Sequence, residues 1–186
     1  TGGAVVFSTG KSNSMSSGKI SMITGNASGF AASGDISSAT GTSATGSSGQ
    51  ILLKTGASYE QLSGDILLSV GQAYGPKPGG SISLSAGSTT SESLSGGRIH
   101  IKAGNVLEGS AVGGNVEISA GQSSLGTGGE IQIMSGKSVS GSSGNVMINT
   151  GDSGVSGRSG SIEIETGKAG SGGSGSVNLI TGASLS

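Results

Sequence analysis

The sequence predicts an all-β fold, a parallel β-solenoid, and two observations on the order of its residues support this. A block of eight residues with glycine at both ends recurs twelve times, and apolar and polar residues alternate inside it. Composition alone would indicate a linker, because 40 Gly and 41 Ser account for much of the 186-residue chain. Only the regular order of the residues argues for a defined structure.

The block reads Gly, any residue, Ile or Val, any, a mostly apolar residue, any, a small or β-branched residue, Gly. Successive blocks start 15 to 17 residues apart, whereas the two glycines of a block are always seven apart. All variation in length therefore falls in the segment between blocks, which is typical of fixed strands joined by variable turns. The blocks begin at Gly3, Gly18, Gly34, Gly49, Gly64, Gly80, Gly97, Gly114, Gly129, Gly144, Gly160 and Gly175.

Side chains within the block follow a period of two. The third position is Ile or Val in every copy, and the fifth is apolar in eleven of twelve, with Ser38 the exception. This alternation, rich in β-branched residues, predicts a half-buried strand. A helix would place neighbours such as Ile99 and Ile101 on different faces.

The short repeat leaves no room for a helical crossover, so we expect one coil per repeat and about twelve coils. The block glycines are expected at corners, where positive φ or a close approach requires them. A second short strand with small inward side chains is expected after each block, which gives a thin, flattened cross-section with two sheets and of unknown handedness. Those small residues are Ser12, Ala27, Ser43, Ser58, Ala73, Ser123, Ser138, Ser153 and Ala169.

Residues 1–186 are expected to form a single repeat domain. No capping element is evident at either end, and an uncapped coil exposes a sheet edge that invites pairing. We therefore expect a segment of a longer array or a stacking unit of a fibre.

Composition excludes several function classes. A net charge of −1 without a basic patch argues against nucleic acid as a partner. No apolar run approaches the roughly 20 residues that span a bilayer, so no membrane insertion is expected. With no Cys and one His, we expect no cofactor and no metal site.

Some motifs resemble catalytic sites, but they are better explained as parts of the repeat because the other residues or elements of such sites are missing. Residues 170–175 match Gly-x-Gly-x-x-Gly, but a phosphate site needs that pattern between a strand and a helix. Residues 151–154 resemble a serine-protease nucleophile segment, yet His100 is the single histidine and the rest of a triad is missing. Glu163 and Glu165 lie on one solvent-facing side of a block. We therefore expect that the protein is not an enzyme.

Two neighbouring blocks carry apolar residues on both sides, which predicts a lateral contact. Leu52 and Leu67 occupy the outward fourth position, and Tyr59 and Tyr74 follow in the same repeats. The prolines in residues 76–78 are expected to shape a stiff turn beside this patch.

Two weaker features concern single residues. Asn26 begins an Asn-Ala-Ser sequon at a predicted turn, which makes it a possible N-glycosylation site in a secreted protein. His100 is expected to pair with Glu117 on the next coil.

The twelve Gly-x-Ile-x-Leu-x-Thr-Gly-like blocks resemble those of repetitive extracellular parallel β-solenoid proteins of the surface-fibre and adhesin-shaft type. The resemblance covers the whole chain and carries no signature of one named family. It implies a structural, non-catalytic protein, extracellular or at the cell surface, that forms or belongs to a filament, surface layer or adhesive shaft. The implied partners are copies of the chain, end to end through uncapped coils or side by side; contact with carbohydrate has no support in the residues.

Two alternatives stay open on the sequence. An ice-binding (antifreeze) solenoid needs a flat outward threonine lattice, whereas the regular threonines share the side of the apolar residues and the outward columns are irregular; the opposite sheet is less certain. A polysaccharide-active β-helix needs long loops that form a cleft, and the segments between blocks are too short and uniform for one.

Overall fold

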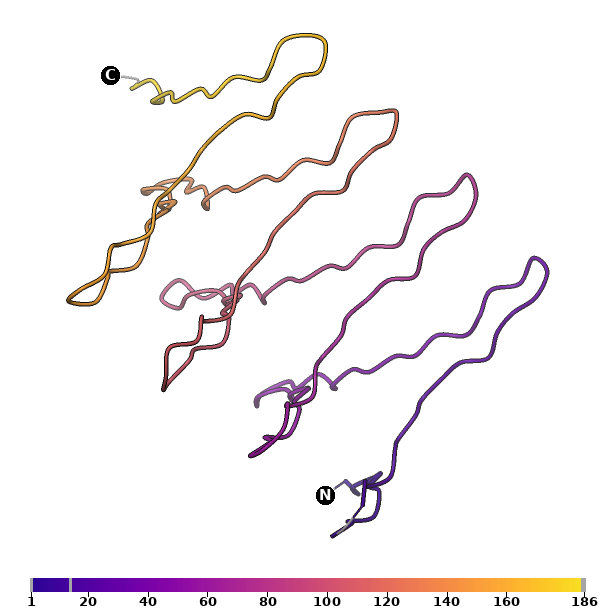
Figure 1. Ribbon diagram of the computed structural model, residues 1–186. Coiled ribbons are helices and arrows are strands. Elements are labelled where there is room, and N and C mark those ends of the chain that lie inside the picture. Colours follow the sequence, from indigo (N-terminus) through magenta and orange to yellow (C-terminus); the bar gives the residue numbers. More distant parts are fainter. Residues whose placement is uncertain (1, 14, 185–186) are drawn as a thin grey trace. The chain divides into compact units, whose positions relative to one another are not determined.

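A computed structural model describes residues 2–13 and 15–184 of the chain (Figure 1). Within these ranges the chain contains no α-helix and no β-strand, so there are no element bounds to give. Long extended runs alternate with short bends instead. The predicted all-β parallel β-solenoid, with its twelve coils and two sheets, is therefore wrong.

The physical reason lies in the backbone hydrogen bonds. A solenoid needs each strand to pair with the next coil at about 4.7–4.9 Å, through a continuous ladder of N–H and C=O groups. Five backbone–backbone hydrogen bonds are found in the described residues, and each lies at a bend or closes a loop between two blocks. Folded proteins form about one hydrogen bond per residue. The blocks alternate as strands do, but the chain does not supply them with a pairing partner.

Bends fall between the blocks and never inside one, which confirms the predicted position of the turns. The expected second short strand is wrong, because these segments bend where that strand was placed. The bends lie at residues 13 and 15, 29–30, 44–46, 59–61, 75–77, 92–94, 108–110, 124–126, 139–141, 155–156 and 170–172.

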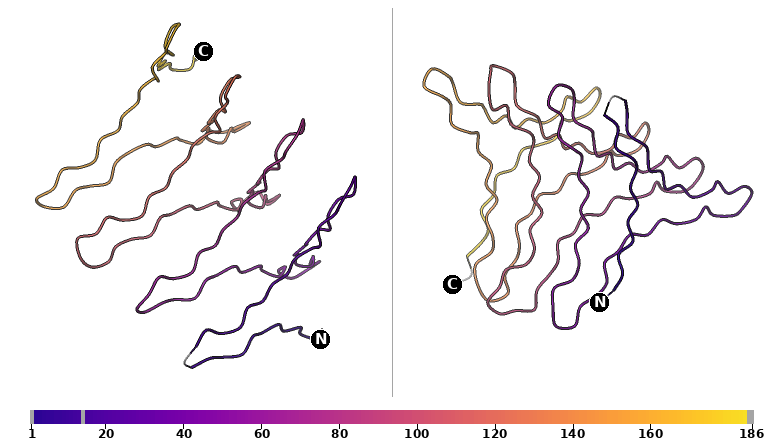
Figure 2. Two further views of the ribbon diagram at one scale, coloured as in Figure 1. Left: turned by 45° about the vertical axis from the view of Figure 1, so that its right-hand side comes forward. Right: turned by 90° about the horizontal axis from the view of Figure 1, so that it is seen from below.

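The chain divides into two units, Thr1–Gly96 and Gly97–Ser186, which we describe separately. Each contains the same succession of extended blocks and bends, as both views of Figure 2 show. That residues 1–186 form a single repeat domain stays a prediction.

The exposed surface is that of an open chain. The accessible surface is 19014 Å². A folded monomer of 17.5 kDa would expose about 7,900 Å², and its fully unfolded chain about 25,000 Å². None of the described residues is buried, so the predicted apolar core is absent from that part of the chain. The few half-buried residues are Thr24, Thr55, Ala103, Ser138 and Thr150.

Candidate interaction surface

Two rows of apolar side chains run through the repeats, and we name them row three and row five after their block positions. In extended backbone, residues two apart point to the same side, so both rows share one side of each block. Row-three side chains from Ile20 onward are 51–56 % exposed, and the apolar row-five side chains are 63–91 % exposed. Row three comprises Val5, Ile20, Ile36, Ile51, Ile66, Ile82, Ile99, Val116, Ile131, Val146, Ile162 and Val177; row five comprises Phe7, Met22, Ser38, Leu53, Leu68, Leu84, Ile101, Ile118, Ile133, Ile148, Ile164 and Leu179.

The first glycine of most blocks lies against the seventh residue of the block before it. A Cβ atom added to Gly18 would lie 3.0 Å from Thr9 Cβ, and one added to Gly80 would lie 2.7 Å from Val70 Cγ1. These separations are too short for a real Cβ atom without a shift of its neighbour. These first glycines thus lie close to a side chain of the preceding block, and this closeness explains why several seventh-position residues are half-buried.

In the second unit the same closure carries backbone hydrogen bonds. The N–H of Gly114 donates to the carbonyl of Gly104 at 3.0 Å, and Gly144 donates to Gly136 at the same distance. Gly129 repeats the bond with Gly121 at 2.9 Å. Each bond joins the last glycine of one block to the first glycine of the next, so the segment between them forms a closed loop with adjacent ends.

The last glycine of each block has no such neighbour. A Cβ atom at Gly71 or Gly87 would meet nothing within 4 Å, and the same holds for the other described last glycines. Positive φ does not account for them either. The positive-φ glycines, Gly29, Gly75, Gly109 and Gly172, all lie in or beside the bends between blocks. The expectation that every block glycine occupies a corner is therefore wrong for this column.

Serine hydroxyls stabilise the bends, a role that the sequence analysis missed. In five repeats the serine two residues after the block accepts a hydrogen bond from the backbone N–H three residues further on; Gly126 and Gly141 donate to Ser123 and Ser138 at 2.8 Å. This is the serine turn motif, in which a side chain replaces a backbone acceptor. Its signal was present in the sequence, where these serines were assigned to an inward strand. The accepting serines are Ser12, Ser43, Ser58, Ser123 and Ser138.

The turn predicted at the two prolines is confirmed at Pro76, whereas Pro78 lies just after the bend at 75–77. The N–H of Lys77 donates to the carbonyl of Gly75 at 2.9 Å, so Pro76 is the central residue of a three-residue turn. The fixed φ of proline suits that central position. Gly75 precedes it with φ of 105°, which glycine adopts without strain.

The residues of the predicted lateral contact are all exposed and all lie in the first unit. Leu52 is 71 % exposed and Leu67 is 85 % exposed, on the opposite side of their blocks from rows three and five. Tyr59 lies in the bend at 59–61, and Tyr74 immediately precedes the next bend. The structure brings none of them into a shared site, and the lateral contact stays a prediction.

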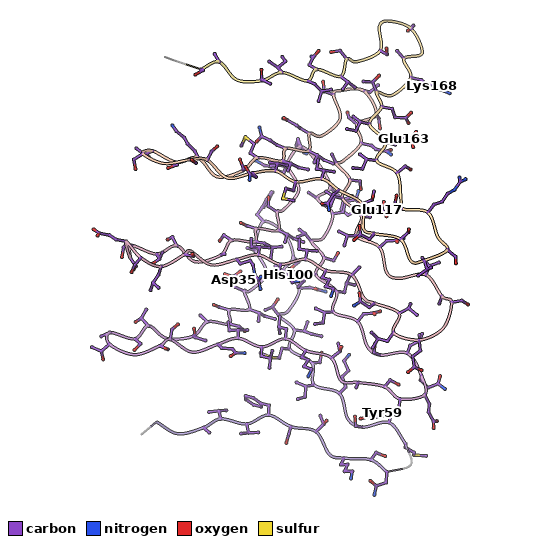
Figure 3. All side chains as sticks on the ribbon, turned by 90° about the vertical axis from the view of Figure 1, so that its left-hand side faces the viewer. Asp35, Tyr59, His100, Glu117, Glu163 and Lys168 are labelled. Carbon is purple, nitrogen blue, oxygen red and sulfur yellow. The ribbon has the colours of Figure 1, made fainter. Side chains whose placement is uncertain are left out.

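Single polar residues show no organised site in the described chain. Asn26 is exposed, three residues before the bend that begins at Gly29, and its glycosylation stays a prediction. The hydrogen bonds of described side chains involve Ser, Thr and Asn, and none joins His100 to Glu117. Figure 3 shows these two residues apart, so the expected pair is not formed.

The described residues also lack two further kinds of feature. No three of their His, Asp and Glu side chains gather closely enough to hold a metal ion. No helix with the length and apolar character needed to cross a bilayer occurs among them.

One hollow lies in the first unit, where the first two blocks meet. Its volume is about 320 Å³, and Phe7, Ile20, Ser21 and Met22 line it. Three of these four side chains belong to rows three and five. The lining offers one hydroxyl and no ionisable group, so its chemistry is that of an apolar recess and not of a catalytic site.

Comparison of the chain with protein-family models, curated proteins and solved structures finds no match.

Proposed function

We propose that this chain is a structural, non-catalytic protein, extracellular or at the cell surface, whose copies associate to form or join a filament, a surface layer or an adhesive shaft. The single observation that carries the proposal is the exposure of rows three and five along the whole series of repeats. The rows supply exposed apolar side chains in nearly every block, and exposed apolar surface is typical of interaction sites in proteins.

The exposed area supports association with a large partner. The chain exposes 19014 Å², against about 7,900 Å² for a folded monomer of its mass. The difference, roughly 11,000 Å², exceeds the 2,000–5,000 Å² buried in many obligate interfaces. Association offers the apolar rows the burial that the described chain does not give them.

Low charge favours copies of the same chain as that partner. Nine basic and ten acidic residues leave a net charge of −1, and charged residues make up 10 % of the chain. Copies therefore repel one another weakly, whereas a strongly charged chain would oppose its own assembly. End-to-end stacking stays a prediction, although its premise of stacked coils is not met by the structure.

Sedimentation of the purified chain over a hundredfold range of concentration, with negative-stain electron microscopy of the same samples, tests this proposal. We expect a monomer at the lowest concentration and regular fibres or sheets above a threshold. A chain that stays monomeric throughout overturns the proposal, and ice-crystal shaping is then the next assay.

A further inference from the structure

We propose that the copies associate edge to edge, with the extended blocks of one chain adding as strands to the blocks of a second copy. The inference rests on the proposed function and specifies the contact surface: the backbone of the blocks, with rows three and five brought onto one face of an intermolecular sheet.

Unpaired backbone groups are the first observation behind this inference. The five backbone–backbone hydrogen bonds of the described chain leave the interior of every described block without one. Extended backbone with free N–H and C=O groups is a template for strand addition, in which main-chain hydrogen bonds supply affinity and alternate side chains supply specificity. The blocks offer both features together.

The apolar rows set the register of that pairing. Rows three and five share one side of each block, so correct pairing produces a continuous apolar face. A slip by one residue would turn every row of the added chain to the opposite face. Ile118 and Ile133, which are 69 % and 70 % exposed in the isolated chain, would then remain in solvent instead of becoming buried. The alternation thus favours one register.

The spacing of the blocks identifies the occupant as a second copy. Blocks recur every 15 to 17 residues, and the irregular steps follow a fixed order along the chain. A second copy has the same separations between blocks in the same order. When two copies align in parallel and in register, each block therefore lies beside the same block of the other copy. A partner without this spacing would match one or two blocks and leave the others exposed.

Proline substitution separates block pairing from any general effect on the chain. Glu117→Pro with Gln132→Pro removes one N–H from the middle of each of two blocks. The matched control, Leu125→Pro with Ser140→Pro, places proline at the centre of the bends at 124–126 and 139–141. In the described chain none of these four N–H groups donates a hydrogen bond, so neither pair of substitutions removes a hydrogen bond from the isolated chain.

We expect the block pair to raise the concentration threshold for assembly by about tenfold or more, and the bend pair by less than about twofold. Fibre diffraction of the parent assembly should show the 4.7–4.8 Å spacing of paired strands. Hydrogen exchange should show protection of block amides that appears only on assembly.

Three results overturn the inference. If the parent chain assembles and both proline pairs assemble equally well, the blocks do not pair, although the proposed structural function survives. Equal loss of assembly in both pairs also rules out a special role for the blocks. If the parent chain stays monomeric and assembles only with a different protein, both the inference and the proposed self-association fail.

Discussion

The first glycine of most blocks lies close to a side chain of the preceding block, whereas a Cβ atom added at the last glycine would meet nothing within 4 Å. Gly80 is the tightest case, since its missing Cβ atom would lie 2.7 Å from a methyl group of Val70. The twelvefold repeat of glycine at both positions therefore has two different causes. Contact within the chain accounts for the first, and the structure of the isolated chain does not account for the second.

Gly80→Ala should open the loop between Val70 and residue 80, because the added methyl group occupies the space of the Val70 side chain. The nuclear Overhauser contact between Val70 and residue 80 is expected to disappear. Gly71→Ala, whose new methyl group would meet nothing within 4 Å, is the matched control and should keep that contact. Persistence of the contact in Gly80→Ala would contradict this account of the first glycine.

At the scale of the repeat, the sequence predicted the positions of the bends better than the pairing of the extended blocks. The bends between blocks and the turn at Pro76 follow from local residue preferences, and the structure has them. The predicted solenoid failed because alternation of residues such as Ile99 and Ile101 indicates a chain suited to a sheet without identifying its neighbour. Intrachain coils and separate copies satisfy that pattern equally.

Part of the candidate interaction surface could also be predicted from the sequence, and part could not. The apolar rows could be read from the sequence, because each block shows which side chains share a side. Their exposure could not be read from the sequence, since burial depends on what packs against the rows. The serine turns at Ser123 and Ser138 were visible as residues but were assigned to a strand, because small size and hydrogen-bonding capacity suggest different roles.

Leu52→Glu with Leu67→Glu should weaken association, since two carboxylates would enter the predicted lateral contact and desolvation of a charge is costly. Ser37→Glu with Ser83→Glu adds the same charge at the fourth position of two other blocks and is the control. Sedimentation should show a higher assembly threshold for the leucine pair alone. Equal thresholds for the two pairs would remove Leu52 and Leu67 from the contact.

At the scale of the whole molecule, the described chain lacks the buried surface that makes unfolding cooperative. A folded domain of 186 residues would absorb about 130 kcal/mol at its melting temperature. Calorimetry of the dilute monomer should show no such peak, and a peak should appear above the assembly threshold and move with concentration. A sharp peak at one temperature, independent of concentration, would instead demonstrate a core within the single chain.

The loop closures described above join each block only to the block that follows it. The close approach of Thr9 to Gly18, or of Val70 to Gly80, involves no distant part of the chain. Unequal recombination can therefore add or delete whole repeats without disturbing the contacts of those that remain. Chains of different repeat number would retain the same local geometry, so gene length alone would set the length of the array while its chemistry stayed constant.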